Sequence, residues 1–182
     1  MIILNQMRDK IFYLIFFSFI LAFSRVIPHP PNFTPILASA VMGPLLIKDR
    51  LYGTAIPIIA MFISDTLIGF HPYQFAIYFT ILTISLISPM KKKYKLLGFM
   101  AISASVWFFV TTNFAVWVIW DFYPKTLEGL IICYESAIPF FKNTLISTLL
   151  FTGLLFILSN YLETINNKIF YYFTNVFYKA FK

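Results

Sequence analysis

The stretch Arg25-Val-Ile-Pro-His-Pro-Pro-Asn-Phe-Thr-Pro35 separates two strongly apolar runs of the chain. It holds four of the ten prolines and one of the two histidines. Proline fixes φ, has no amide hydrogen, and drives the residue before it out of the helical region. The stretch therefore predicts a stiff, non-helical connector that holds polar groups at the rim of a hydrophobic body.

The apolar runs on either side dominate the composition. The chain has 182 residues, of which 60% are hydrophobic and 12% charged, and its mean hydropathy is +0.82. This apolar fraction exceeds the usual half of a soluble protein. A helix that crosses a bilayer needs about 20 mostly apolar residues, and the chain has room for several. We therefore predict an all-α membrane protein that forms a single membrane domain over residues 1–182.

The apolar runs divide into six expected transmembrane helices, which form a bundle. The second of them is short, so it must be tilted, extended by its flanks, or sheltered inside the bundle. Five spans with a re-entrant second segment are the alternative. A cleaved signal peptide over residues 1–24 is disfavoured, because cleavage would leave the proline-rich stretch at a free terminus. The expected spans are residues 11–27, 35–47, 51–69, 73–90, 96–120 and 139–161.

The basic residues set the expected orientation of this bundle. Eleven of the 14 fall on one side of the six-span arrangement, which the positive-inside rule makes cytoplasmic. We therefore expect a multi-pass protein of the bacterial inner membrane with both termini in the cytoplasm. No basic stripe suited to nucleic acid is present. The eleven are Arg8, Lys10, Lys48, Arg50, Lys91, Lys92, Lys93, Lys95, Lys168, Lys179 and Lys182.

Two segments outside the spans have apolar stripes of their own. Residues 126–138 place apolar side chains three and four positions apart, which predicts a short amphipathic helix on the outer face between spans 5 and 6. Residues 162–182 combine a second stripe with lysines, which predicts an amphipathic tail on the cytoplasmic surface. A loosely ordered tail is the alternative for this second segment.

Polar residues within and beside the spans gather toward the outer side. Ionisable groups at membrane depth are costly and usually face the protein interior or a water-filled cavity. We therefore expect an outward-open pocket, floored by Asp65 and Asn113 and covered by residues 25–35 and 126–138. The candidate substrate-binding residues are Arg25, His29, Asn32, Asp65, His71, Asn113, Trp117, Asp121, Tyr134 and Asn143.

A purely structural interpretation of the same residues stays open at this point. Arg25 and Asp65 could form an ion pair between helices. Trp117 and Trp120 could belong to the aromatic belt that membrane proteins place at the interface. In that case the polar cluster would hold the bundle together without binding a solute.

Other chemistry has little support in the sequence. The single cysteine, Cys133, excludes an internal disulfide, and its spacing from His29 and His71 matches no metal motif. Motifs of hydrolases, zinc proteases and phosphate-binding loops are missing. We therefore predict no enzyme, no cofactor and no metal site, and ATP-driven transport would need an ATPase on a different chain.

Several longer motifs bear on function together. They are Arg25-x-x-Pro-His-Pro-Pro-Asn-Phe-Thr-Pro35, Ser64-Asp65 with Gly69-Phe-His71, Thr112-Asn-Phe-x-Val-Trp117, Tyr123-Pro-Lys-Thr126, Cys133-Tyr134 and Ile138-Pro-Phe-Phe-x-Asn-Thr144. In these the chain resembles a bacterial family of uncharacterised putative transport proteins. That family is similar to the S components of energy-coupling factor (ECF) transporters, small six-helix membrane proteins that bind vitamins or their precursors near the outer surface.

The resemblance implies a substrate-binding subunit for uptake of a small polar solute. Its expected partners are the solute, the lipid bilayer, a transmembrane coupling protein and separate ATPases. In the pocket, Arg25 or His29 would pair with an anionic group, and the tryptophans would stack on a ring. Two alternatives remain: a membrane-embedded enzyme acting on a periplasmic or lipid-linked substrate, and a structural or assembly subunit of a membrane complex.

Overall fold

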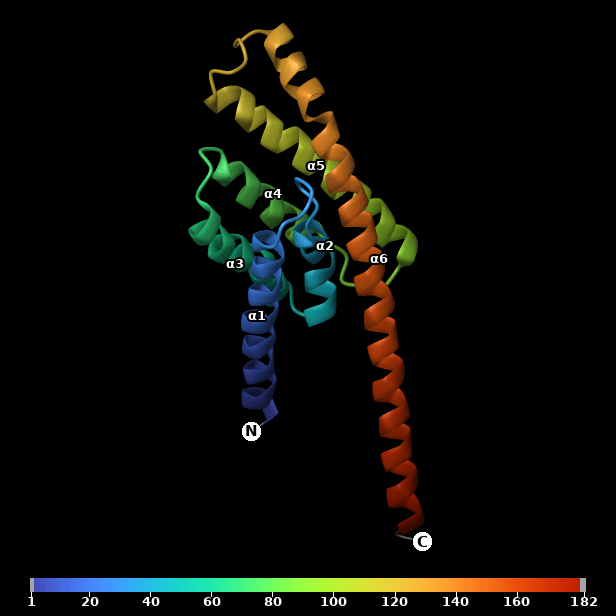
Figure 1. The fold of residues 1–182 in the computed structure, drawn as a ribbon. Coiled ribbons are helices and arrows are strands. Elements are labelled where there is room, and N and C mark those ends of the chain that lie inside the picture. Colours follow the sequence, from blue (N-terminus) through green and yellow to red (C-terminus); the bar gives the residue numbers. More distant parts are fainter. Residues whose placement is uncertain (1, 181–182) are drawn as a thin grey trace.

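The protein folds into six α-helices in a computed structural model that describes residues 2–180, with side chains described for residues 9–165. Within this range every regular element is a helix, so the all-α class is confirmed. Figure 1 shows their arrangement. The helices are α1 (Ile2–Val26), α2 (Ile36–Ile47), α3 (Arg50–Ile68), α4 (Gln74–Ile87), α5 (Tyr94–Ile119) and α6 (Leu127–Ala180).

Within the part of the chain whose side chains are described, three helices have the length and composition of membrane spans. They are α3, α5 and the part of α6 up to Ile165. These three helices therefore support the prediction from composition that the chain is a membrane protein. α2 and α4 are also apolar but have only 12 and 14 residues. At 1.5 Å per residue they rise about 18 and 21 Å, less than the roughly 30 Å of a hydrocarbon core.

The short helix α2 lies at the centre of the fold. Every residue from Ile36 to Leu45 is buried, and the helix packs against α3, α4, α5 and α6. Val41 and Met42 of α2 and Ile81 of α4 are completely buried in the same apolar core. We expected the short second segment to be tilted, extended by its flanks, or sheltered inside the bundle. The burial of α2 matches shelter inside the bundle.

Helix α1 lies at the edge of the bundle and packs mainly on α3. The Ser18 hydroxyl donates to the carbonyl of Ile56 at 3.2 Å, which fixes the two helices side by side. The outward face of α1 is a row of exposed rings, with Phe12, Phe16 and Phe19 among them. A soluble monomer rarely exposes so large an apolar patch, so this face suits a lipid environment.

The α2–α3 and α4–α5 connections lie on the side of the bundle from which α1 begins and toward which α6 ends (Figure 1). Polar contacts tie them to neighbouring helices. Lys10 Nζ lies 2.7 Å from Asp49 Oδ2, and Lys92 Nζ lies 2.9 Å from Glu163 Oε2. Arg50 donates to the carbonyls of the last turn of α4, including that of Ser88 at 3.1 Å. A cation at a helix C-terminus satisfies carbonyls that have no partner within the helix.

Helix α6 differs from the expectation. The segment 126–138, predicted as a separate helix, forms the first turns of one continuous helix that runs from Leu127 to Ala180. Pro139 does not end the helix, because a proline removes only one backbone bond and neighbouring helices let membrane helices tolerate it. The expected tail over residues 162–182 continues this helix to Ala180, but the side chains of its stripe lie outside the described residues from position 166 onward.

Candidate functional site

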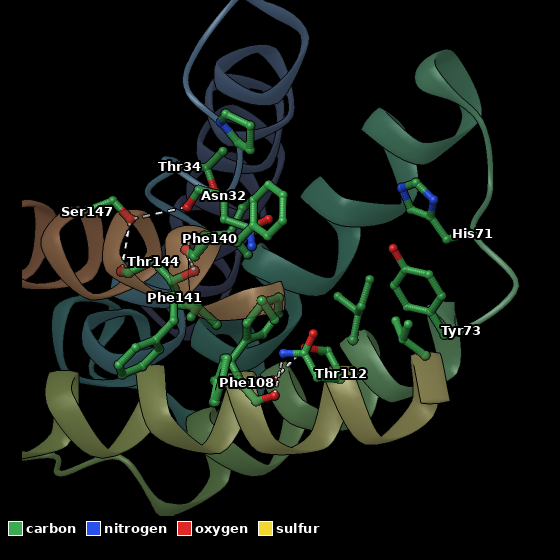
Figure 2. A pocket seen from close by; sticks show the side chains of 18 of the residues that line it. Asn32, Thr34, His71, Tyr73, Phe108, Thr112, Phe140, Phe141, Thr144 and Ser147 are labelled. Carbon is green, nitrogen blue, oxygen red and sulfur yellow. Dashed lines mark hydrogen bonds between the residues drawn. The ribbon is translucent and has the colours of Figure 1, made fainter. Parts of the chain in front are cut away.

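A cavity of about 490 Å³ lies among α2, α4, α5, α6 and the 27–35 loop. Its lining comes from the last turns of α1, α3 and α5 and from the first halves of α2, α4 and α6. The cavity therefore opens at the end of the fold opposite the start of α1. Figure 2 shows Asn32, Thr34 and Ser147 on one side, with His71 and Tyr73 facing them across it. The volume falls in the range of small-molecule sites, roughly 300–1,000 Å³.

The cavity wall is built from two kinds of side chain. Aromatic rings give flat apolar surfaces, and hydroxyl groups give hydrogen-bonding points between them. The rings are Tyr73, Phe108, Phe109, Trp120, Tyr123, Phe140 and Phe141. The hydroxyl groups belong to Thr34, Thr112, Ser136, Thr144, Ser147 and Thr148. Among the described residues that line the cavity, none is acidic and Arg25 is the only lysine or arginine.

An aromatic row forms the wall between the α3–α4 turn and the end of α5. The ring of Tyr73 stacks on His71 at 5.4 Å between centroids, with 14° between the planes. The same tyrosine meets Trp120 edge to face at 5.2 Å and 88°. Edge-to-face and offset-stacked pairs are the favoured geometries of aromatic rings. The row therefore joins two chain segments into a single wall.

An ion pair with Asp65 holds the side chain of Arg25. Its Nη1 lies 2.6 Å from Asp65 Oδ1, 3.4 Å from the Met61 carbonyl, and within bonding distance of the Ser64 hydroxyl. The Asp65 side chain is 1% exposed. The structural interpretation, in which Arg25 and Asp65 link two helices, is thus confirmed by the geometry. Arg25 also lines the cavity, whereas Asp65 does not.

The second oxygen of Asp65 is used by α4. Gln74 Nε2 and the Tyr78 hydroxyl each donate to Oδ2 at 3.0 Å. Asp65 therefore joins α1, α3 and α4 and has no oxygen directed to a solute. The expectation that Asp65 floors the pocket is corrected: the carboxylate lies behind Arg25, because burial of a carboxylate requires these partners.

The proline-rich loop is fastened to α6. Asn143 Nδ2 donates to the Pro31 carbonyl at 3.0 Å, and the Ser147 hydroxyl donates to the Asn32 carbonyl at 3.4 Å. The ring of Phe33 packs on α6 as well. Asn32 has φ +61°, a left-handed conformation that asparagine adopts more readily than most residues. The loop is therefore a wall of the cavity that contacts with α6 hold in place.

The end of α5 explains which of its polar residues reach the cavity. Asn113 lines it and donates from Nδ2 to the Phe109 carbonyl at 2.7 Å. Asn113, Trp117, Trp120 and Asp121 have the sequence spacing that would place them on one face of a continuous helix. α5 ends at Ile119, so Trp120 leaves the helix in an extended conformation and lines the cavity.

The remaining candidates on this side hold the α5–α6 connection. Trp117 Nε1 donates to the Pro124 carbonyl at 2.9 Å, and the Tyr134 hydroxyl donates to the Val110 carbonyl at 2.7 Å. The side chain of Asp121 is fully exposed. All three lie outside the lining of the cavity, because their polar atoms are bonded to backbone or face solvent.

The ten sequence-derived candidates thus separate into two groups. One group lines the cavity: Arg25, His29, Asn32, His71 and Asn113. The other group braces it or lies beside it: Asp65, Trp117, Asp121, Tyr134 and Asn143. On α6 the sequence pointed to Tyr134 and Asn143, whereas other side chains of this helix line the cavity. Phe141, Thr144 and Thr148 stand three and four positions apart, and this helical spacing could have placed them on one face.

No metal site is visible in the described part of the chain. Groups of three or more histidine, cysteine and acidic residues do not occur among those residues. The Cys133 thiol lies 3.5 Å from the Asn113 carbonyl. The ring nitrogens of His29 contact the carbonyls of Pro30 and Arg25, at 2.8 and 3.3 Å. The site therefore offers surfaces and hydrogen bonds for binding.

Comparison with known proteins gives a family for the chain. No curated protein and no solved structure matches it. The sequence profile of a group described as "Family of unknown function (DUF6580)" matches residues 5–172. The matched region includes the whole cavity and most of all six helices. The chain is a member of the DUF6580 family.

Proposed function

We propose that the protein is an integral membrane subunit that binds a small polar solute and takes part in its uptake, in the manner of ECF S components. The cavity carries the proposal. It is large enough for a vitamin-sized molecule, and its rings and hydroxyl groups can hold a ligand that is partly flat and partly polar. It also opens at the end of the bundle away from the basic connections.

The proposal includes six membrane segments with both termini in the cytoplasm. Three long apolar helices support it, as does the burial of α2, which allows a short segment to lie inside the bundle. The ion pairs Lys10–Asp49 and Lys92–Glu163 join segments that the positive-inside rule assigns to the cytoplasm. The cavity then lies on the outer side of a bacterial inner membrane.

Energy for uptake would come from other chains. The sequence contains no phosphate-binding loop, so a transmembrane coupling protein and separate ATPases are the partners that this role requires. The subunit itself would supply capture of the solute. The rate of uptake would therefore rise with the fraction of cavities that hold a solute molecule.

A thermal-shift screen tests the binding step. A ligand of the folded state at 100 times its Kd adds about 2.7 kcal/mol of stability, so one member of a library of vitamins and precursors should raise the melting temperature. The same compound, radiolabelled, should enter cells that express the protein. Asn113→Ala should reduce both effects, because Asn113 lines the cavity.

A matched control comes from α6. Lys142→Ala removes an exposed side chain outside the cavity lining and should leave the shift and the uptake unchanged. Cys133 lines the cavity, but Cys133→Ser keeps the size of the side chain and its hydrogen-bonding group, so this variant should also retain uptake, whereas an enzyme with a reactive thiol would lose turnover. If no compound shifts the melting temperature and Asn113→Ala leaves uptake intact, the proposal is wrong.

A further inference from the structure

We propose that the cavity selects an electrically neutral, planar ring that carries a carboxamide or lactam edge, over the matching carboxylate or ammonium compound. This inference rests on the proposed function and specifies its class of solute. It also differs from the pairing of Arg25 with an anionic group that the sequence suggested. Four observations carry it: the charge of the wall, the donors of Arg25, one hydroxyl group and the aromatic rings of the wall.

The charge of the cavity wall is already balanced. Arg25 is the only lysine or arginine among the described lining residues, and Asp65 compensates it at 2.6 Å from behind. No acidic side chain is found among these described lining residues. An anion would add an unbalanced charge beside the Arg25–Asp65 pair, and a cation would find no carboxylate. A charged solute would lose its hydration without gaining a counter-charge.

The guanidinium of Arg25 nevertheless presents donors. Only Nη1 bonds to other described residues, namely Met61, Ser64 and Asp65. A guanidinium has five N–H donors, and those on Nη2 and Nε bond to no described residue. We assign them to an acceptor in the cavity, which Arg25 lines. Because Asp65 fixes the group, these donors are oriented before a ligand arrives. A carbonyl oxygen is a matching acceptor that carries no net charge.

One buried hydroxyl group of the cavity stands apart from the other buried ones. Thr112 and Thr144 each donate to a carbonyl of their own helix, and Ser147 shares its hydroxyl hydrogen between the carbonyls of Thr144 and Asn32. Thr148 is completely buried, lines the cavity, and has no hydrogen-bond partner for Oγ1 among the described residues. A buried hydroxyl without a partner is unfavourable. Its free donor and acceptor suit the polar edge of a bound ring.

The rings of the wall favour a flat ligand. Phe109 of α5 and Phe141 of α6 meet at 4.8 Å between centroids, and Tyr73 with Trp120 forms the aromatic row near the α3–α4 turn. Figure 2 shows Phe108, Phe140 and Phe141 around the same space as Thr112 and Thr144. Aromatic faces gain most from offset or edge-on contact with another ring. A planar ring can use these faces while its polar edge reaches the hydroxyl group.

The test compares three probes that share one ring. Calorimetry on the purified full chain at pH 7 measures binding of 2-naphthamide, 2-naphthoate and 2-(aminomethyl)naphthalene. We expect the neutral amide to bind at least about tenfold more tightly than either charged probe, a difference of about 1.4 kcal/mol. Equal or tighter binding of a charged probe overturns the inference, and so does the absence of binding by all three.

Two threonines on α6 provide matched variants. Thr148→Val and Thr152→Val each remove a buried hydroxyl group without a described partner, one helical turn apart, but only Thr148 lines the cavity. Thr148→Val should weaken binding of 2-naphthamide by about tenfold, while Thr152→Val should leave the Kd unchanged. Equal effects of the two variants, or no effect of Thr148→Val, overturn the assigned contact.

A variant that removes one charge tests directly whether Asp65 compensates the charge of Arg25. Asp65→Asn keeps the shape of the side chain and leaves the charge of Arg25 uncompensated, so the preferred probe should change from 2-naphthamide to 2-naphthoate. An unchanged preference in a folded Asp65→Asn protein contradicts the inference. If this variant does not fold, the inference is tested by the three probes on the wild type and by the two threonine variants.

The inference and the proposed function fail in different ways. A wild-type preference for 2-naphthoate overturns the neutral class of ligand but leaves solute binding in place. Uptake that does not depend on the protein for any solute contradicts the proposed function, whatever charge preference the purified chain shows. Calorimetry and uptake therefore report on the two proposals separately.

Discussion

Gly43 and Gly53 meet backbone to backbone where α2 crosses α3. A Cβ on Gly43 would lie 2.5 Å from the Gly53 carbonyl oxygen, and a Cβ on Gly53 would lie 2.4 Å from the nitrogen of Pro44. These are contacts with main-chain atoms, which cannot rotate away. The crossing fixes α2 in the centre of the bundle, and the first residues of α2, Ile36 and Leu37, form part of the cavity wall.

Alanine at this crossing should destabilise the protein. For Gly53→Ala we expect a loss of about 1–3 kcal/mol in unfolding free energy, because overpacking forces the two helices apart. The control is Gly98→Ala in α5, where an added Cβ meets nothing within 4 Å. That change should be neutral or stabilising by up to about 1 kcal/mol. Thermal unfolding of both variants in one detergent measures the difference, and equal melting temperatures would contradict the close crossing.

Removal of the Asp65 carboxylate should be far more damaging than removal of an exposed one. Asp65→Ala leaves Arg25 charged and nearly buried, and loss of one partner of a buried pair typically costs about 3–5 kcal/mol. Asp121→Ala is the control, since Asp121 is fully exposed and lies 3.9 Å from Lys125. We expect no measurable change there. Similar melting temperatures for the two variants would show that the Arg25–Asp65 pair does not stabilise the bundle.

A double-mutant cycle separates this pair from unrelated effects. Arg25→Ala combined with Asp65→Ala should be less destabilised than the sum of the single changes, because the double variant leaves no unpaired charge. Strict additivity would show that each side chain acts independently. The cycle needs only melting curves, so it does not depend on knowledge of the solute.

Asn143 should control the mobility of the proline-rich loop. Asn143→Ala removes the bond to the Pro31 carbonyl and should cost about 1 kcal/mol. Hydrogen exchange at the amide of Phe33, which donates to the Pro30 carbonyl at 3.0 Å, should then accelerate, because local opening of the loop becomes easier. Lys142→Ala, which changes an exposed neighbour, should leave this amide unaffected. Unchanged exchange in Asn143→Ala would mean that the loop is held by its other contacts alone.

The sequence was sufficient to locate most helices. Prolines and charged residues interrupt the apolar runs, so the expected segment 35–47 coincides with α2 to within one residue. Prediction from the sequence failed where a local rule, that proline ends a helix, conflicts with the packing of the whole fold. Pro139 suggested a boundary, but α6 continues through it. Periodicity cannot show whether neighbouring helices will stabilise a helix across a proline.

The cavity was predictable as a region more than as a set of contacts. Several of the polar residues near the ends of the apolar runs lie around it, and Arg25 and Asn113 line it. Whether Asp65 faces a solute or an arginine 40 positions away depends on how α3 is rotated against α1. That rotation follows from packing over many residues, and no local pattern encodes it. For the same reason the sequence could not separate Thr148 from Thr152.

At the opposite end of the bundle, Asp49 joins a helix cap to an ion pair. Its Oδ1 accepts from the amides of Leu51 and Tyr52 at 3.0 and 3.2 Å, and Oδ2 lies 2.7 Å from Lys10 Nζ. The hydrogen bond from Lys10 is the largest cause that lowers the pKa of Asp49 below its ordinary value of 3.8. A lowered pKa in the folded state means that the carboxylate stabilises the fold above the ordinary pKa. This contribution is lost as the pH falls through the folded-state pKa.

Asp49→Asn should therefore reveal a pH-dependent stability. Asparagine caps a helix as well as aspartate does, so the variant loses the charge and keeps the cap. At pH 7 it should be less stable than the wild type by at most about 1 kcal/mol, because both partners are partly exposed. The gap in melting temperature should close below pH 3.8, where protonated Asp49 resembles asparagine. Asp49→Ala should lose about 1 kcal/mol more through the missing cap at every pH. A gap between wild type and Asp49→Asn that stays constant from pH 7 to the acid range would contradict the coupling of Asp49 to Lys10.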